Sequence, residues 1–178
     1  MRPRLEQGLI QVYTGNSKGK STAAFGLALR AVGHGFHVYI IQFMKGSSYY
    51  GELDAFKRLE PECRLEHFGL QGWVKKGEAK PEDVAEARKA LARAEAVMLS
   101  CEWDLIILDE INNALWFELL SLDEALGFLA KKPAQVELVL TGRNAPPEII
   151  EKAQLVTEMQ ELKHPYQLGI GARKGIEY

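Results

Sequence analysis

Nine residues near the start of the chain have the types and spacing of a phosphate-binding loop: Thr14-Gly15-Asn16-Ser17-Lys18-Gly19-Lys20-Ser21-Thr22. A polyphosphate is a dense anion, so a loop holds it only where several backbone N–H groups converge without intervening side chains. In such a loop Lys20 neutralises phosphate charge and the Ser21 hydroxyl coordinates Mg²⁺. The generic pattern G-x-x-x-x-G-K-[ST] has glycine where this chain has Thr14, with Gly15 one place later. The alternative interpretation is a surface turn of the same composition.

A second chemical signal is a short apolar run, Leu105 to Leu108, which ends in the acids Asp109 and Glu110. In proteins with a phosphate-binding loop, such a strand delivers a carboxylate toward Mg²⁺ beside the phosphates. Either acid can be the direct ligand. On its own the run is weak evidence, since many buried strands end in a polar residue, and the interpretation depends on its pairing with the loop.

Two further side chains are candidates for a role in the site. Arg143 follows a predicted strand, so we expect it at the sheet edge where α/β proteins bind ligands, holding a phosphate or a substrate carboxylate. From position alone, a solvated or structurally paired arginine is an equal alternative. Trp73 is a large aromatic in a loop of glycine and lysine, which favours a functional role. Trp103 and Trp116 flank the acidic strand, and we expect them in the core. The histidines have no metal-binding spacing.

The elements that position these residues follow from β-rich runs that alternate with helical stretches, which predicts an α/β fold with a mostly parallel sheet covered on both faces. The phosphate-binding loop falls between a predicted strand, 9–14, and a helix from Lys20 to about Val32, as its mechanism requires. Ser121 and Glu124 form a capping box that opens another helix. Further strands are predicted at 37–43, 64–68, 105–108, 136–140 and 155–162, and further helices through 56–59, at 81–100 and from Pro146.

Composition excludes several classes of protein. The chain has 178 residues, which is one ordinary domain, 1–178, and its formal net charge of -2 argues against nucleic-acid binding. Its apolar runs are shorter than the roughly 18 residues that span a bilayer, and the start lacks the apolar region of a signal peptide. Cys63 and Cys101 are isolated and are expected to be reduced thiols. We therefore expect a cytoplasmic protein with no membrane partner.

The combination of motifs resembles the ATP:corrinoid adenosyltransferases, and the resemblance runs from Gly8 to Tyr178. It is carried by the phosphate-binding loop, in which the shifted glycine is the family's own form. It also includes Arg30-Ala-Val-Gly-His-Gly35, Gln42-Phe-Met-Lys-Gly46, Leu108-Asp-Glu-Ile-Asn112, Thr141-Gly-Arg143 and Gly175-Ile-Glu-Tyr178.

This resemblance implies a P-loop fold of the RecA-like type, a homodimer, and a reaction in which Co(I) of a reduced corrinoid attacks C5′ of ATP and expels triphosphate. It implies that the nucleotide lies reversed in the loop and that a flavoprotein serves as the reductant. Ser21 and Glu110 would hold Mg²⁺ or Mn²⁺. The nucleotide would contact the loop and an arginine: Gly15, Asn16, Ser17, Lys18, Gly19, Lys20, Ser21, Thr22 and Arg143.

Two departures from the family concern how the corrin is covered. Only seven residues precede Gly8, where some members have an extended N-terminal segment, and the corrin-facing loop presents one aromatic, Trp73, where two are usual. We expect Trp73 to press on the lower face of the cobalt and displace its axial ligand, with packing on its own loop or at a dimer contact as the alternative. The rival functions are a RecA-type ATPase, a nucleoside kinase and a nucleotide-binding regulator without turnover.

Overall fold

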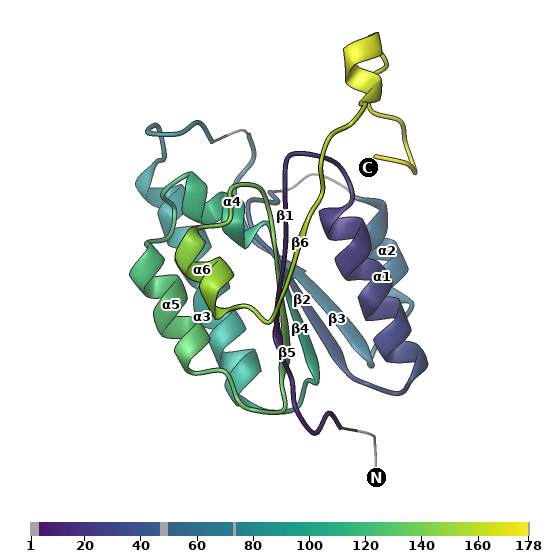
Figure 1. Cartoon of the computed structure of the whole chain (residues 1–178), viewed down its shortest axis with the longest axis vertical. Coiled ribbons are helices and arrows are strands. Elements are labelled where there is room, and N and C mark those ends of the chain that lie inside the picture. Colours follow the sequence, from purple (N-terminus) through teal and green to yellow (C-terminus); the bar gives the residue numbers. More distant parts are fainter. Residues whose placement is uncertain (1–3, 47–49, 73, 178) are drawn as a thin grey trace.

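The computed structural model describes residues 4–46, 50–72 and 74–177, and within them it forms a sheet of six parallel strands in the order β3-β2-β4-β5-β1-β6 (Figure 1). The parallel α/β sheet predicted from the sequence is therefore confirmed. In chain order the strands are β1 (Ile10–Thr14), β2 (Val38–Gln42), β3 (Cys63–His67), β4 (Leu105–Asp109), β5 (Glu137–Thr141) and β6 (Leu155–Glu158).

Helices cover both faces of this sheet, as expected. Figure 1 shows α1 and α2 on one face and α3, α4, α5 and α6 on the other. The α-helices are α1 (Lys20–Gly33), α2 (Gly51–Lys57), α3 (Pro81–Leu99), α4 (Ile111–Trp116), α5 (Leu122–Ala130) and α6 (Pro147–Lys152), and a 3₁₀ turn, η1 (Pro165–Leu168), follows β6. The predicted capping box of α5 is present, because the Ser121 hydroxyl accepts the Glu124 N–H at 3.2 Å.

The central strands are buried on both faces, which explains why they read as continuous apolar runs. Every residue of β2 and of β4 is buried. One apolar cluster lies between the sheet and the face with α3 to α6, and a second lies between the sheet and the face with α1 and α2. Burial of each large aliphatic side chain there contributes about 1.5–3 kcal/mol to the free energy of folding. The sheet is therefore a stable support for the residues at its strand ends.

Since all the strands are parallel, their carboxyl ends meet at one edge of the sheet. Gln42 is paired in register with Asp109 across β2 and β4, and Tyr13 with Thr141 across β1 and β5. The segments that follow these strands include the phosphate-binding loop, the two acids and Arg143. The topology thus gathers at one edge the motifs that the sequence separates.

Two elements and the placement of one side chain differ clearly from expectation. The short helix α4 was not predicted, and it begins directly after the two acids. Strand β6 was expected to reach residue 162 but ends at Glu158. Its four residues are exposed, and it is the outermost strand of the sheet, next to β1. The placement of Trp116 in the core was wrong: it is 43% exposed, because α4 turns it toward a surface cavity, whereas Trp103 is buried as expected.

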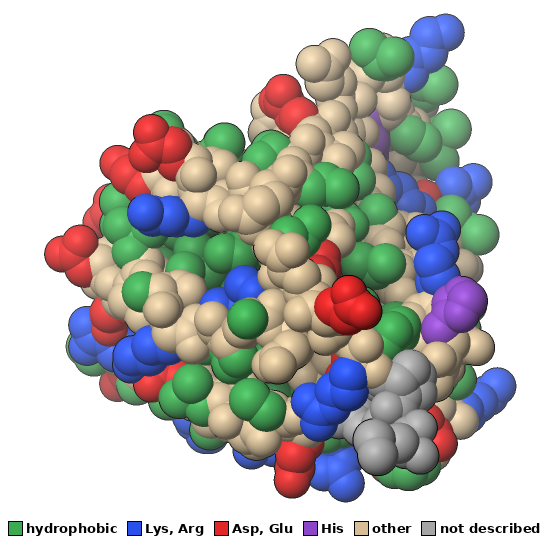
Figure 2. Space-filling model, turned by 60° about the horizontal axis from the view of Figure 1, so that its bottom comes forward, with side chains coloured by type: hydrophobic (Ala, Val, Ile, Leu, Met, Phe, Trp, Pro, Cys, Tyr) green, Lys and Arg blue, Asp and Glu red, His purple; other side chains and the backbone are tan. Residues whose placement is uncertain are grey.

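The described residues contain no helix long and apolar enough to cross a bilayer. Figure 2 shows the molecule with the bottom of the Figure 1 view turned forward, and on this face acidic and basic side chains are interspersed over the described surface. The assignment of residues 1–178 to one domain stays a prediction.

Candidate active site

The phosphate-binding loop joins the end of β1 to the start of α1, and its backbone requires two glycines. Gly15 has φ 99°, and a Cβ there would lie 2.4 Å from the Met159 carbonyl oxygen that follows β6. Gly19 has φ 124° at the N-cap of α1. The hydroxyl of Thr14, at the position where the generic pattern has glycine, accepts the Ala145 N–H at 3.3 Å. The shifted glycine is thus required by the close approach of the segment after β6.

Lys20 provides a buried positive charge at the first turn of α1. Its side chain is 7% exposed, and its Nζ donates to the carbonyls of Gly15 at 2.8 Å and Ser17 at 2.6 Å. Burial lowers the pKa of Lys20, and the nearby Glu110 carboxylate opposes that shift. These contacts hold the ammonium against the loop, at the cavity that an anion would enter.

The two acids after β4 have different surroundings. Asp109 is fully buried, and its carboxylate accepts from the Thr141 hydroxyl at 2.7 Å and from Gln42 Nε2 at 3.1 Å. Glu110 has a left-handed backbone, φ 66°, which turns the chain away from the strand direction, and its side chain lines the cavity. Asp109 therefore links the ends of β2, β4 and β5 by hydrogen bonds, while Glu110 faces the cavity.

Glu110 is held by the residues around it. Its backbone N–H donates to the Thr141 hydroxyl at 3.0 Å, and its carboxylate accepts from Asn113 Nδ2. Burial is the main cause that raises the pKa of Glu110, and the neighbouring Asp109 adds to it. The cations Lys45, Lys20 and Arg143 act in the opposite direction. A hard divalent cation would relieve the same electrostatic cost.

We predict that Asp109→Ala lowers the free energy of unfolding by roughly 1–3 kcal/mol, because the buried Thr141 hydroxyl loses its acceptor and Gln42 Nε2 keeps only Glu52 as an acceptor. Urea denaturation followed by circular dichroism measures this loss. An unfolding midpoint equal to that of the wild type would contradict this role of Asp109.

Arg143 lies where it was expected, after β5 at the carboxyl edge, and it lines the cavity. Its backbone N–H donates to Asn113 Oδ1 at 2.7 Å, so Asn113 links Arg143 to Glu110. The preceding Gly142 has φ 132°, and a Cβ there would lie 2.9 Å from the Asn113 nitrogen. Asn113 was missed by the sequence analysis, because the short helix that places it beside Glu110 was not predicted and shows no periodic pattern.

Lys45 is the second residue that the sequence analysis left out of the site. Its Nζ lies 4.0 Å from the centroid of the Tyr50 ring, and both residues line the cavity. Lys45 belongs to the segment Gln42–Gly46, which was recognised as a motif without a role. Its place just after β2 puts an additional positive charge opposite the phosphate-binding loop.

These residues surround two adjoining cavities. The first, of about 460 Å³, is lined by the phosphate-binding loop from Ser17 to Thr22, by Glu110 and Arg143, and by the C-terminal residues Gly175 to Glu177. The second, of about 670 Å³, has apolar walls from Met44, Leu70, Val74, Trp116, Phe117 and Leu119. Both are lined by Lys45, Tyr50, Glu110, Asn113, Arg143 and Glu177.

The predicted site residues are brought together to different extents. Ser17, Lys18, Gly19, Lys20, Ser21, Thr22, Glu110 and Arg143 line the first cavity. Gly15 shapes the loop and accepts from Lys20 through its carbonyl, and Asn16 lies in the same loop. Trp73 lies outside the described residues. Trp116, which was assigned to the core, lines the second cavity instead, with Lys76 Nζ 3.5 Å from its ring centroid.

The donor set of the first cavity suits a magnesium ion. Mg²⁺ prefers oxygen ligands and is commonly bound by one or two carboxylates together with substrate phosphates. The Ser21 hydroxyl and the Glu110 carboxylate line the same cavity. The described residues contain no group of three or more histidine, cysteine or acidic side chains placed to hold a metal alone. A metal in this cavity would therefore depend on phosphate oxygens for part of its coordination.

The sequence is similar to one family of enzymes over nearly its whole length. The family described as ATP:corrinoid adenosyltransferase BtuR/CobO/CobP matches residues 6–178. The corrinoid adenosyltransferase of Pseudomonas aeruginosa is 41% identical over 175 residues, which are 98% of this chain and 86% of that protein. Proteins of the same name from Sinorhizobium sp. and Escherichia coli K12 are 40% and 36% identical over 97% of this chain, covering 81% and 87% of their own lengths.

Proposed function

The chain belongs to the ATP:corrinoid adenosyltransferase family, so it transfers the adenosyl group of ATP to a corrinoid, and we propose that its two adjoining cavities hold those two substrates. The observation that carries this proposal is the shared wall. Glu110, Asn113 and Arg143 line both the phosphate-binding cavity and the larger apolar one. A reaction between a nucleotide carbon and a corrin-bound cobalt requires this kind of adjacency.

In this proposal the triphosphate occupies the first cavity. The backbone from Gly15 to Thr22 cradles it, Lys18, Lys20 and Arg143 neutralise its charge, and Ser21 and Glu110 hold Mg²⁺ or Mn²⁺ against it. The metal would supply charge neutralisation to the phosphates when bound. The nucleotide lies reversed relative to hydrolytic P-loop enzymes, so that C5′ points toward the second cavity.

The proposed reaction is a displacement at C5′ of ATP. The electron pair of Co(I), in the corrinoid substrate, forms the Co–C5′ bond as the C5′–O bond breaks, and triphosphate leaves with the bonding pair. Cobalt becomes Co(III), and no proton is transferred. Because Co(I) is a strong nucleophile, Glu110 is not needed as a base. The protein acts by positioning the reactants and by stabilising the negative charge that grows on the leaving group.

The second cavity is proposed to receive the corrin, whose ring faces are apolar. Its wall contains the exposed ring of Trp116 beside Val74 and Phe117. Trp73, which precedes Val74 in the sequence, keeps its proposed role of displacing the lower axial ligand of the cobalt. A homodimer and a flavoprotein reductant are also proposed, from the family alone.

We predict that Trp116→Ala raises KM for the corrinoid roughly tenfold or more, since burial of a large apolar side chain is worth about 1.5–3 kcal/mol. KM for ATP should stay unchanged, and Trp116→Phe should recover most of the loss. Leu99→Ala, which truncates another exposed apolar side chain at the end of α3, is the control and should alter neither constant. An equal rise in both KM values for Trp116→Ala would show a general disturbance rather than a corrin contact.

The function is tested by mixing the protein anaerobically with a chemically reduced corrinoid and ATP labelled at C5′. Transfer of the label to the corrinoid in a stable Co–C bond is the expected result. A RecA-type ATPase or a nucleoside kinase would leave the label on a nucleotide, and that outcome would overturn the proposal.

A further inference from the structure

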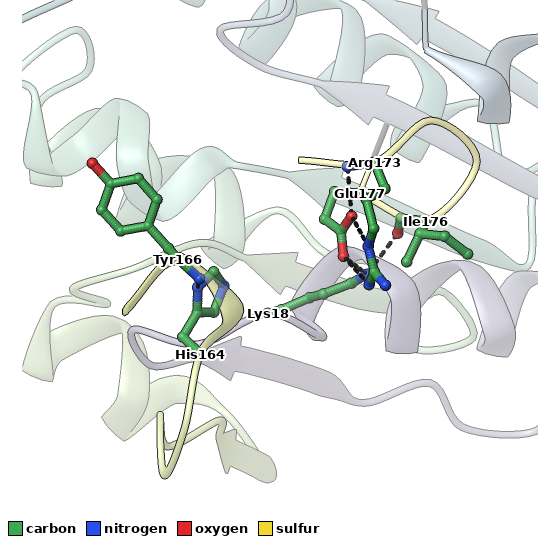
Figure 3. Close-up of polar contacts among 6 residues, drawn as sticks. All are labelled: Lys18, His164, Tyr166, Arg173, Ile176 and Glu177. Atoms are coloured by element: carbon green, nitrogen blue, oxygen red, sulfur yellow. Dashed lines mark hydrogen bonds and ion pairs between the residues drawn. The ribbon is translucent and has the colours of Figure 1, made fainter. Parts of the chain in front are cut away.

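The C-terminal segment Arg173–Glu177 folds back onto the phosphate-binding loop (Figure 3). Lys18 Nζ donates to the Ile176 carbonyl at 2.6 Å and lies 3.5 Å from Glu177 Oε1. These contacts join parts of the chain that are 158 residues apart. We call Arg173–Glu177 the strap, since its last residues line the first cavity beside the loop.

Within the strap, Arg173 holds the Glu177 carboxylate by three contacts. Its Nη2 lies 3.0 Å from Oε1, its Nε lies 3.2 Å from Oε2, and its backbone N–H donates to Oε2 at 2.8 Å. A guanidinium fork of this kind fits a phosphate group as well as it fits a carboxylate. The Arg173 guanidinium holds the pKa of Glu177 down to about 2, so the carboxylate is ionised at neutral pH.

The position of this carboxylate is unexpected for a site that binds phosphates. Glu177 lines a cavity that also contains the acids Glu52 and Glu110 and four cations, Lys18, Lys20, Lys45 and Arg143. The negative charge of Glu177 would repel a bound triphosphate. While Glu177 contacts Lys18, the Lys18 ammonium is also not free to bind a phosphate. Glu177 therefore stands where an anionic ligand would be attracted.

We propose that Lys18 and Arg173 form an additional subsite for the phosphate end of the nucleotide, and that Glu177 is an internal anion which the phosphates displace from it. This rests on the proposed function, because it places the triphosphate in the first cavity. Exposed ion pairs contribute little to stability, so little free energy is lost when a more highly charged ligand replaces the Glu177 carboxylate at Lys18 and Arg173. Arg173 then becomes a phosphate-positioning residue contributed by the strap.

The subsite is tested by the binding of inorganic tripolyphosphate to the full chain, without metal or corrinoid, by calorimetry at fixed ionic strength. Arg173→Ala should weaken binding about tenfold, the order expected for one lost charge-assisted contact. Glu177→Gln keeps the size of the side chain and removes the competing charge, so it should tighten binding about threefold or more. Lys174→Ala removes a positive charge from the adjacent position and should change the affinity less than about twofold.

The opposite signs separate the subsite from a purely structural role of the strap. If Arg173→Ala binds tripolyphosphate as the wild type does, or if Glu177→Gln binds more weakly, the subsite is wrong and the ion pair only shapes the strap. If the wild type binds neither tripolyphosphate nor ATP, the proposed function fails as well. Thermal unfolding of each variant identifies any effect that arises from misfolding.

Discussion

Lys20→Ala is expected to lower kcat/KM for ATP roughly ten- to a hundredfold, because a charge-assisted contact is worth about 1.5–3 kcal/mol. The loss should be larger in kcat if the contact strengthens as triphosphate gains charge. The ammonium of Lys20 is buried beside the cavity and is held there by two loop carbonyls. Steady-state kinetics with varied ATP measure the effect, and far-UV circular dichroism should be unchanged.

Lys132 offers a matched control for Lys20. Its Nζ donates to the carbonyls of Gly8, Pro133 and Val136, and burial lowers its pKa as it does for Lys20. Lys132 lies before β5, at the opposite edge of the sheet. Lys132→Ala should therefore affect stability without changing the use of ATP. Wild-type kinetics in Lys20→Ala would contradict the assignment of the phosphate-binding loop.

The second large effect is expected for Glu110→Gln, which should lose roughly a hundredfold in activity at low Mg²⁺ and recover part of it as Mg²⁺ is raised. Metal stabilisation of charge on a phosphoryl group is worth several kcal/mol, and the amide is a weaker ligand than the carboxylate. Titration of activity against Mg²⁺ in both proteins measures this. A hydrolase that used Glu110 as a base would show no such recovery. Glu52→Gln, which changes another carboxylate of the same cavity, should leave the Mg²⁺ dependence as in the wild type.

The pH dependence of Glu110 provides a second readout. Burial and Asp109 raise its pKa, so it takes up a proton at a higher pH than an ordinary glutamate, and the protonated form does not bind a cation. Mg²⁺ affinity should thus begin to fall above the usual titration range of glutamate as pH decreases. A raised pKa in the folded state also means that the ionised carboxylate costs stability at neutral pH. Glu110→Gln should therefore be at least as stable as the wild type at pH 7.

Strands, and the positions of the residues that follow them, were predictable from local sequence patterns. The strands around Val38–Gln42 and Leu105–Asp109 were recognised because strands buried on both faces are continuous apolar runs. Once the sheet is parallel, the loop after β1, the acids after β4 and Arg143 after β5 must meet at one edge. The placement of these residues around one cavity was predictable for this reason.

Other features depend on contacts between distant segments and were not predictable. Asn113 matters because α4 places it between Glu110 and Arg143, and α4 is too short for a periodic pattern to reveal. The strap has no periodicity, and its contact with Lys18 is visible only in the folded chain. Trp116 was misplaced because an apolar residue near a buried strand usually packs inward, whereas here it forms a cavity wall.

Strand β6 illustrates a limit of a different kind. Its apolar residues Leu155 and Val156 predicted a strand, and the strand exists, but both side chains are exposed at 41% and 42%. A β-propensity signal reports the backbone state of a segment and does not report whether a neighbouring element covers it. The edge position of β6 became apparent only from the strand order.

Whether triphosphate is the leaving group of an adenosyl transfer is decided by ³¹P NMR of the reaction with ATP and Co(I) corrinoid. We expect one tripolyphosphate for each corrinoid that gains a Co–C bond, and no phosphate product when corrinoid is omitted. Orthophosphate or ADP as the product, with or without corrinoid, would contradict it.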